Sequence, residues 1–449
     1  MIAVLTALIP LAAALVGTEA GALDGPRVLS LDEAERVGLA HQPLVAEARA
    51  EADAAAARAD QARAPLLPQL TGTAAYQRST ANYVARPGAS PASTNAIATA
   101  AARGTSYDFY NASLTLSQLL WDFGQTTNRW RAARAGARVQ EASAETQRQQ
   151  VLLRIRTTYF AAQATHALVV VARDGLGNSD RHLTQIRAFV DVGTRPEIDI
   201  AQALTARANA EVRLIQAEND EVAARAELDA AMGLERPADY HLSDEPWGPI
   251  TGESEPLDAL VTGAISRRPD VRAAETQLAA QELTLQAARN SFWPALGAGA
   301  TASEAGPTPD NLIWNWKAQL VLNWTLFQGA LTPAQIREQR AQLSGAAAAR
   351  DLVRQTTTLE VLQATNGVRA QRAVVAAAAR ALESARRQLA LAEARYDTGM
   401  GSALELDDAQ LALTNAGAQA VAAQFSLSTA RAQLAKALGL SDSNPRRKP

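Results

Sequence analysis

The residues that could take part in chemistry are few and are not arranged for it. The adjacent carboxylates Asp407 and Asp408 could act as an acid–base pair, but such pairs are more often solvated helix surface. The four histidines are scattered through the chain without the spacing of metal ligands. Gly297 and Gly299 form a Gly-x-Gly pair within a strand-like stretch, which is a weak signal for a phosphate loop. We therefore expect no enzyme, no cofactor and no metal site.

The composition excludes several further classes of protein. The 449-residue chain is 47% hydrophobic and 20% charged, has a formal net charge of −3 and contains no cysteine. It therefore has no disulfides or thiolate metal sites, and its charge pattern argues against nucleic acid as a partner. Residues 1–22 are expected to be a signal peptide, because Met1–Val16 is apolar and small residues precede Leu23. No later stretch has the ~18 consecutive apolar residues of a transmembrane helix.

The stretch Ile313–Leu326 alternates apolar and polar side chains, as a β-strand with two unlike faces does. Tryptophans stand near both ends of the apolar face. The distance from Trp316 to Trp324 is ~27 Å at ~3.3 Å per residue, which rises ~20 Å when the strand is tilted. This favours a transmembrane strand over a soluble, half-buried one. The side chains expected to face lipid are Trp314, Trp316, Leu320, Leu322 and Trp324.

The chain contains an internal tandem duplication. Leu31 matches Leu257 at an offset of 226 residues, and farther along Leu120 matches Leu326 at an offset of 206. The two offsets differ by a loop insertion between the strands of the first half. The expected units are a first repeat at 23–234, a connector at 235–256, a second repeat at 257–440 and a flexible tail at 441–449.

Each repeat is predicted to contain a helix, two strands and a long helical hairpin. The strands are expected at about 66–84, 107–120, 292–303 and 312–326. An open sheet of four strands would expose its edges to lipid, so it must close across subunits. Two copies would supply about eight strands and three would supply about twelve, and both numbers are known for barrels.

The hairpin helices are long and carry heptad repeats. The helix from Ala330 to Tyr396 would extend ~100 Å at ~1.5 Å per residue, too far to pack within a globule. Alanines recur every seven residues along the returning helices, which is typical of a closely packed coiled-coil seam. The hairpin tips are expected near 191–196 and 397–402.

On these features the sequence resembles the TolC family of outer-membrane efflux and secretion proteins. The resemblance rests on the duplication, on Leu120–Gly124, on Arg268–Val271 and above all on Arg395-Tyr-x-x-Gly-x-x-Ser-x-Leu-Glu405. It implies an α+β membrane protein that forms a homotrimer, with a 12-stranded β-barrel in the outer membrane of a Gram-negative bacterium and an α-helical tunnel in the periplasm. The implied partners are outer-membrane lipid, a periplasmic adaptor (membrane fusion) protein and an inner-membrane pump of the RND, ABC or MFS type.

The resemblance also implies two sets of site residues. A periplasmic gate would be lined by Glu405 and Asp408, with Asp199 as the first-repeat counterpart of Glu405 and Tyr396 in the network that holds the gate shut. Ser402-x-x-Glu405 also fits a helix-capping box, although the gate is favoured, and the tip residues can serve only to make the turn. Pro196 replaces the serine in the first repeat, so the two tips need not bind an adaptor equally. The adaptor-docking residues would be Val192, Gly193, Arg395, Gly399, Ser402 and Leu404.

Three functions fit these features to different degrees. A passive outer-membrane duct of a tripartite efflux pump or a type I secretion system fits them best. A soluble periplasmic coiled-coil scaffold or adaptor would require the tryptophan-bearing strand to lie outside the membrane. An adhesin or other barrel would require long surface loops, and the loops here are short.

Overall fold

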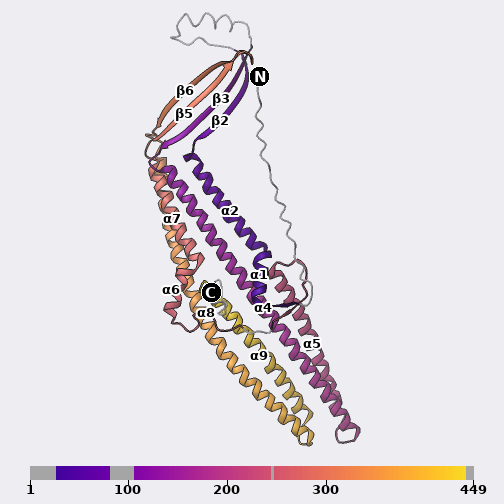
Figure 1. Cartoon of the computed structure of the whole chain (residues 1–449). Coiled ribbons are helices and arrows are strands. Elements are labelled where there is room, and N and C mark those ends of the chain that lie inside the picture. The colour runs from indigo at the N-terminus through magenta and orange to yellow at the C-terminus, as the bar shows by residue number, and fades with distance from the viewer. Residues whose placement is uncertain (1–26, 81–105, 244–246, 441–449) are drawn as a thin grey trace, which may run out of the picture.

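The computed structural model describes residues 27–80, 106–243 and 247–440, which form an elongated molecule (Figure 1). Four long strands lie at one end of the molecule, and two helical hairpins reach the other end. The expected signal peptide, the loop insertion, the continuation of the first strand to Val84 and the tail lie outside the described residues.

The two repeats have the same order of main elements. The first repeat and the connector contain β1 (Arg27–Leu29), α1 (Leu31–His41), α2 (Pro43–Arg63), a short 3₁₀ turn η1 (Ala64–Leu66), β2 (Gln69–Thr80), β3 (Ser106–Trp121), α4 (Gln125–Asp191), α5 (Glu197–Met232) and β4 (Tyr240–Leu242). The second contains α6 (Leu257–Arg267), α7 (Pro269–Asn290), β5 (Ala295–Gly306), β6 (Ile313–Asn323), α8 (Leu331–Asp397) and α9 (Ala403–Ala437). Helices α4 and α8 each have 67 residues, which gives each a length of ~100 Å.

The prediction of a single helix before each strand pair was wrong, because each is two helices. Gln42 separates α1 from α2 with φ −69° and ψ 117°, and Arg268 separates α6 from α7 with φ −66° and ψ 129°. Each precedes a proline, which disfavours the α conformation for the preceding residue. The following helix then begins with Pro43 or Pro269 in its first turn, where the missing N–H costs little.

The connector is also less irregular than predicted. Its strand β4 pairs in parallel with β1, so the described chain has two short strands besides the four long ones. Tyr240 on β4 is buried, and its hydroxyl donates to Asp229 on α5 over 2.9 Å. The Tyr159 hydroxyl on α4 donates to the Leu29 carbonyl over 2.9 Å. These contacts attach the connector to the hydrophobic core at the waist of the molecule.

The long hairpins pack along small side chains, as the heptads predicted. Ten alanines recur every seven residues, at 203–231 on α5 and at 409–437 on α9. Eight of them are buried, and Ala217 and Ala430 are partly buried. Small side chains of this kind let paired helices approach closely. Within the described part of the chain, no helix combines the length and hydrophobicity needed to cross a membrane.

The long strands form one antiparallel sheet in the order β2-β3-β5-β6. Strand β5 begins at Ala295 instead of the predicted 292 and continues to Gly306. Strand β6 ends at Asn323 instead of 326, so Trp324 lies just past its end. Among the described residues, each edge strand has hydrogen-bonding partners on one side only.

Candidate functional site: the apolar sheet face and the hairpin tips

The register of the sheet sorts side chains onto an apolar and a polar face. On the apolar face, leucines of the first, second and fourth strands are solvent-exposed, with Leu320 at 71%. On the polar face, the Thr115 and Thr301 hydroxyls lie 3.3 Å apart on neighbouring strands. One row across the apolar face is Gly72, Leu114, Ala302 and Trp316, and the next row across the polar face is Thr71, Thr115, Thr301 and Lys317. A water-soluble sheet would cover the aliphatic face, whereas here that face is open.

Aromatic side chains stand at both ends of the apolar face. At the end far from the helices, the rings of Tyr76 and Tyr110 are 5.0 Å apart. At the end next to the helices, the rings of Phe123 and Trp293 stack at 5.3 Å, and the Trp324 indole N–H donates to the Phe292 carbonyl over 3.1 Å. Aromatic girdles on either side of an apolar band are a feature of outer-membrane strands. The five residues predicted to face lipid are all exposed.

The hairpin tips at the opposite end of the molecule share one backbone design. Gly193 and Gly399 both have φ +77°, a left-handed conformation that glycine adopts without steric cost. The Gly193 N–H donates to the Val190 carbonyl over 2.9 Å, and the Gly399 N–H donates to the Tyr396 carbonyl over 3.0 Å. An added Cβ at either glycine would meet no atom within 4 Å, so the backbone conformation, not crowding, is what calls for glycine.

Tyr396 lies at the centre of the contact between the two tips. Its side chain is 1% exposed, and its ring touches His182 edge-on at 5.2 Å and Phe189 at 6.1 Å, both on α4. Its hydroxyl is buried without a hydrogen-bond partner among the described residues. Burial raises the pKa of Tyr396, and nearby Arg195 acts to lower it. Tyr396 therefore contributes through its ring and its backbone carbonyl.

Arg195, in the first tip, joins the two hairpins and was missed by the sequence analysis. Its guanidinium lies over the Tyr396 ring at 4.4 Å and donates to the Tyr396 and Gly401 carbonyls, each over 3.1 Å. A Gln185 amide on α4 also donates to the Asp397 carboxylate. The sequence did contain a signal for Arg195. The repeat offset of 206 aligns Arg195 with Gly401, so the first tip has a long charged side chain where the second has none.

Glu405 takes part in both a cap and an ion pair. Ser402 is the N-cap of α9, and its hydroxyl accepts the Glu405 N–H over 3.2 Å. The Glu405 carboxylate pairs with Arg395 on α8 over 3.0 Å, with both side chains partly exposed. The structure thus brings together a predicted gate residue and a predicted docking residue within one hairpin. Of the other tip residues, Val192 and Leu404 are strongly exposed.

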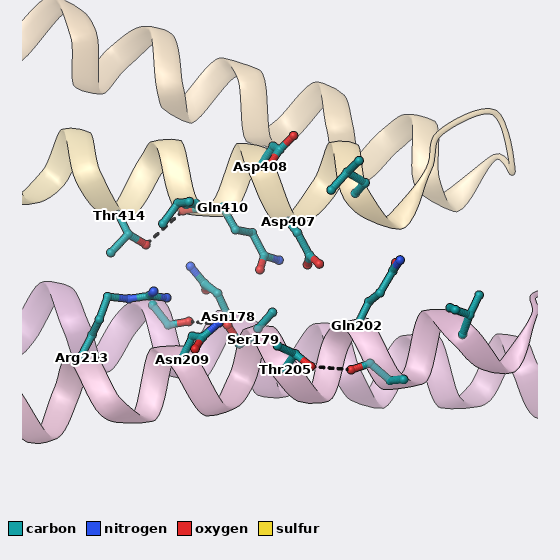
Figure 2. A pocket seen from close by; sticks show the side chains of 16 residues that line it. Asn178, Ser179, Gln202, Thr205, Asn209, Arg213, Asp407, Asp408, Gln410 and Thr414 are labelled. Atoms are coloured by element: carbon teal, nitrogen blue, oxygen red, sulfur yellow. Dashed lines mark hydrogen bonds between the residues drawn. The ribbon is translucent and has the colours of Figure 1, made fainter.

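A groove of about 490 Å³ lies between α9 and the pair α4 and α5, and all three helices contribute polar side chains to its lining. Figure 2 shows Asp407 and Gln410 pointing from α9 toward α5, and Gln202 pointing from α5 toward α9, while Asp408 points away from α5. Asp408 is exposed, and Asp199 is buried near the start of α5.

Asp407, which the sequence analysis dismissed as helix surface, is the carboxylate turned into this groove. One of its oxygens is buried without a hydrogen-bond partner among the described residues. Burial raises the pKa of Asp407, and the charges of Asp408 and Asp199 raise it further. Burial of His182 lowers the pKa of its imidazole. In the described ranges, no group of three or more His, Cys, Asp or Glu side chains could hold a metal ion.

Comparisons with known proteins show the family to which this chain belongs. The family model for outer membrane efflux proteins matches residues 37–234 and 260–440. The chain belongs to the outer membrane efflux protein family. This confirms the resemblance inferred from the duplication and the tip motif, and identifies the protein as an outer-membrane efflux channel with its helical part in the periplasm. Both the family and several of its relatives are described as outer-membrane efflux proteins.

Relatives and solved structures cover most of the chain. The toluene efflux pump outer membrane protein TtgF of Pseudomonas putida is 28% identical over 354 residues, covering 74% of this chain and 69% of TtgF. Protein CyaE of Bordetella pertussis is 27% identical over 399 residues, covering 85% and 78%. The outer membrane protein VceC from Vibrio cholerae matches with a TM-score of 0.77 at 20% identity, covering 91% and 96%. The CmeC outer membrane channel of Campylobacter jejuni matches with a TM-score of 0.78 at 17% identity, covering 93% and 87%. These likenesses confirm the fold.

Proposed function

We propose that three copies of this chain form a passive duct, in which the sheets close a 12-stranded barrel and the helices form the periplasmic tunnel. The observation that carries the proposal is the open sheet, whose aliphatic face is exposed between two groups of aromatic side chains. Such a face is stable in lipid, and its unpaired edges require neighbouring strands there. Nothing in this role requires catalysis, because a pump in the inner membrane would supply the energy.

We propose a tripartite efflux pump as the setting, with a periplasmic adaptor and an inner-membrane pump. Relatives at 25–28% identity are named as components of pumps for toluene, solvents and antibiotics. This supports small-molecule cargo over a type I secretion substrate. The exposed tip side chains Val192 and Leu404, with the neighbouring Gly193, Arg395, Gly399 and Ser402, would contact the adaptor.

The membrane assignment is tested by a pair of adjacent substitutions. Leu320→Arg would place a charge on the lipid face near the middle of β6, at a cost of ~2–4 kcal/mol per subunit. Gln319→Arg, on the opposite face, should be tolerated. The measurement is the yield of heat-modifiable trimers from outer-membrane fractions. Equal yields for the two variants would show that β6 does not face lipid.

We propose that the carboxylates at the tips form the gate, with Asp408 as the main contributor. Asp408 is exposed, whereas Glu405 is engaged with Arg395, and Asp199 is buried. In a trimer, Glu405 and Asp408 would supply six carboxylates, which should attract cations. In planar bilayers, Asp408→Ala should reduce cation preference more than Glu405→Ala does, and the double variant should lose block by multivalent cations. Unchanged selectivity in the double variant would place the constriction elsewhere.

A further inference from the structure

The four-stranded sheet has two free edges, β2 and β6. Each edge presents a row of backbone N–H and C=O groups without partners in the sheet, which must be satisfied where the strands lie in lipid. The repeated sequence allows the pairing of these edges to be worked out residue by residue.

The strand pairing repeats at the same offsets as the sequence. In the first hairpin Gln69 is paired with Ser117, and in the second Ala295 is paired with Asn323. Adding the offset of 226 to the first partner and 206 to the second converts one pair into the other. Both hairpins therefore have the same register, and the offsets apply to structure as well as to sequence.

The pairing of β3 with β5 joins the end of one repeat to the start of the next. It places Thr115 opposite Thr301, with Ser113 opposite Ser303 two residues away. An equivalent junction must exist wherever the second repeat of one copy meets the first repeat of another.

We propose that β6 pairs with β2 of the next copy in the register of the β3–β5 junction. Adding 206 to the residue numbers of β3 and subtracting 226 from those of β5 converts the pair Thr115 and Thr301 into Val321 opposite Ala75 of the next copy. The same operation places Gln319 opposite Gln77 and Leu322 opposite Ala74. This register rests on the trimer proposed above and specifies its seam.

The register keeps the two faces of the sheet continuous. Leu322 and Ala74 both lie on the apolar face, and Gln319 and Gln77 both lie on the polar face. A slip by one residue would place apolar side chains beside polar ones. A slip by two residues would keep the faces but move the attached helices ~6.6 Å along the strands. Helix α4 packs on α7 within the chain, so the offsets predict that α8 packs on α2 of the next copy. A slip by two residues would disrupt that packing.

The seam differs from the internal junction at its periplasmic end. Inside one chain, the Asn290 side-chain amide donates to the Phe123 carbonyl over 2.8 Å, and the Phe123 ring stacks on Trp293. The offsets convert Asn290 to Ala64 and Phe123 to Gly329, so the seam cannot repeat either contact. The seam must therefore be held at this end by contacts other than these two.

Cysteine pairs test the register directly, because the chain has no cysteine of its own. Opposed Cα atoms in an antiparallel pair lie ~4.5–5.5 Å apart, within disulfide range, while residues offset by two lie ~7–8 Å apart, outside it. The matched variant is Val321→Cys with Ala75→Cys. The controls combine Val321→Cys with Thr73→Cys or with Gln77→Cys, and an independent matched pair is Gln319→Cys with Gln77→Cys.

Each variant is oxidised in outer-membrane fractions. Its heat-modifiable trimer is then purified and boiled before electrophoresis. We expect both matched pairs to give intermolecular disulfides at least about tenfold faster than the controls. If Val321→Cys cross-linked faster to Thr73→Cys or to Gln77→Cys than to Ala75→Cys, the register would be wrong but the trimer would stand. Trimers without cross-links in any pair would also overturn the register. A chain without cysteines that forms no trimer would overturn the proposed function itself.

Discussion

The two hairpin tips have the same backbone but different side-chain roles. Helices α4 and α8 end at matching residues, and the turns have the same left-handed glycine. Two positions after this glycine, the first tip has Arg195 and the second has Gly401. A Cβ at Gly401 would lie 3.0 Å from the Tyr396 nitrogen, so the second tip has no room for a side chain there. Arg195 instead extends from the first tip and donates to the Gly401 carbonyl of the second.

The aligned acids of the two tips also face different surroundings. Asp199 is buried, and its charge acts on Tyr396 and on Asp407. Glu405, its counterpart, is partly exposed and pairs with Arg395 in its own hairpin. The duplication has therefore kept the fold of the tip while the first tip became the donor of the contact and the second became the acceptor.

The largest effect is expected from Arg195→Ala. The variant loses charge-assisted hydrogen bonds to two carbonyls and the contact with the Tyr396 ring, which together contribute about 2–3 kcal/mol to the joined state of the tips. The open population should rise by roughly 30-fold or more. The measurement is the resting single-channel conductance in planar bilayers.

Two matched variants sharpen this result. Arg187→Ala removes an exposed arginine on α4 and should leave the conductance unchanged. Tyr396→Phe removes a hydroxyl that has no partner among the described residues, so it should also have little effect. If Tyr396→Phe opened the channel and Arg195→Ala did not, the hydroxyl and not the guanidinium would hold the tips together.

The sequence predicted what depends on local periodicity. The length of α8 followed from its heptads and from Thr398–Gly401, and the strand faces followed from the alternation around Trp316 and Leu320. The break at Pro43 was readable by the same rules, but the helical pattern on either side concealed it.

The remaining features depend on how distant parts of the chain pack together. The contact of Arg195 with Tyr396 and the position of Asp407 in the groove are set by the angle between the two hairpins, which no local pattern encodes. The parallel pairing of β1 with β4 joins a three-residue strand at the start of the first repeat to a three-residue strand in the connector. Strands this short give no periodic signal.

A smaller and symmetric effect is expected from the turn glycines. Gly193→Ala and Gly399→Ala each force alanine into a left-handed conformation, at about 1–2 kcal/mol. Since both sites have open space for the methyl group, the two costs should be equal. Hydrogen exchange of the tip amides should accelerate by roughly 5- to 30-fold in each variant. Met400→Ala, at an exposed position beside the turn, is the control. Unequal effects would mean that one tip is held by contacts outside its own turn.

The smallest expected effect is the response of the tips to acid, which depends on His182 at their centre. His182 is buried against Tyr396, with Asp199 on α5, Asp397 on α8 and Arg195 in the turn nearby. Burial lowers the pKa of the His182 imidazole, although Gln185, Asp397 and Asp199 partly oppose this shift.

Because the lowered pKa belongs to the folded tip, the neutral imidazole is the form that the folded tip favours. Its stabilising contribution is complete above the unfolded pKa of about 6.5 and falls as the pH drops below that value. At pH 5.5 the loss is at most about 1.4 kcal/mol, so the open population should rise by up to about tenfold.

The channel conductance between pH 7.5 and 5.5 measures this response. His182→Gln keeps a neutral polar side chain and should flatten the profile, whereas His166→Gln on the same helix should not. The raised pKa of Asp407 acts in the opposite direction, because protonation of that carboxyl at lower pH removes the cost of burying its charge and the repulsion from Asp408 and Asp199. Asp407→Asn should therefore strengthen the joined state near neutral pH and leave the His182 response in place. If the pH dependence of the conductance persisted in His182→Gln but disappeared in Asp407→Asn, its source would be Asp407 in the groove and not His182.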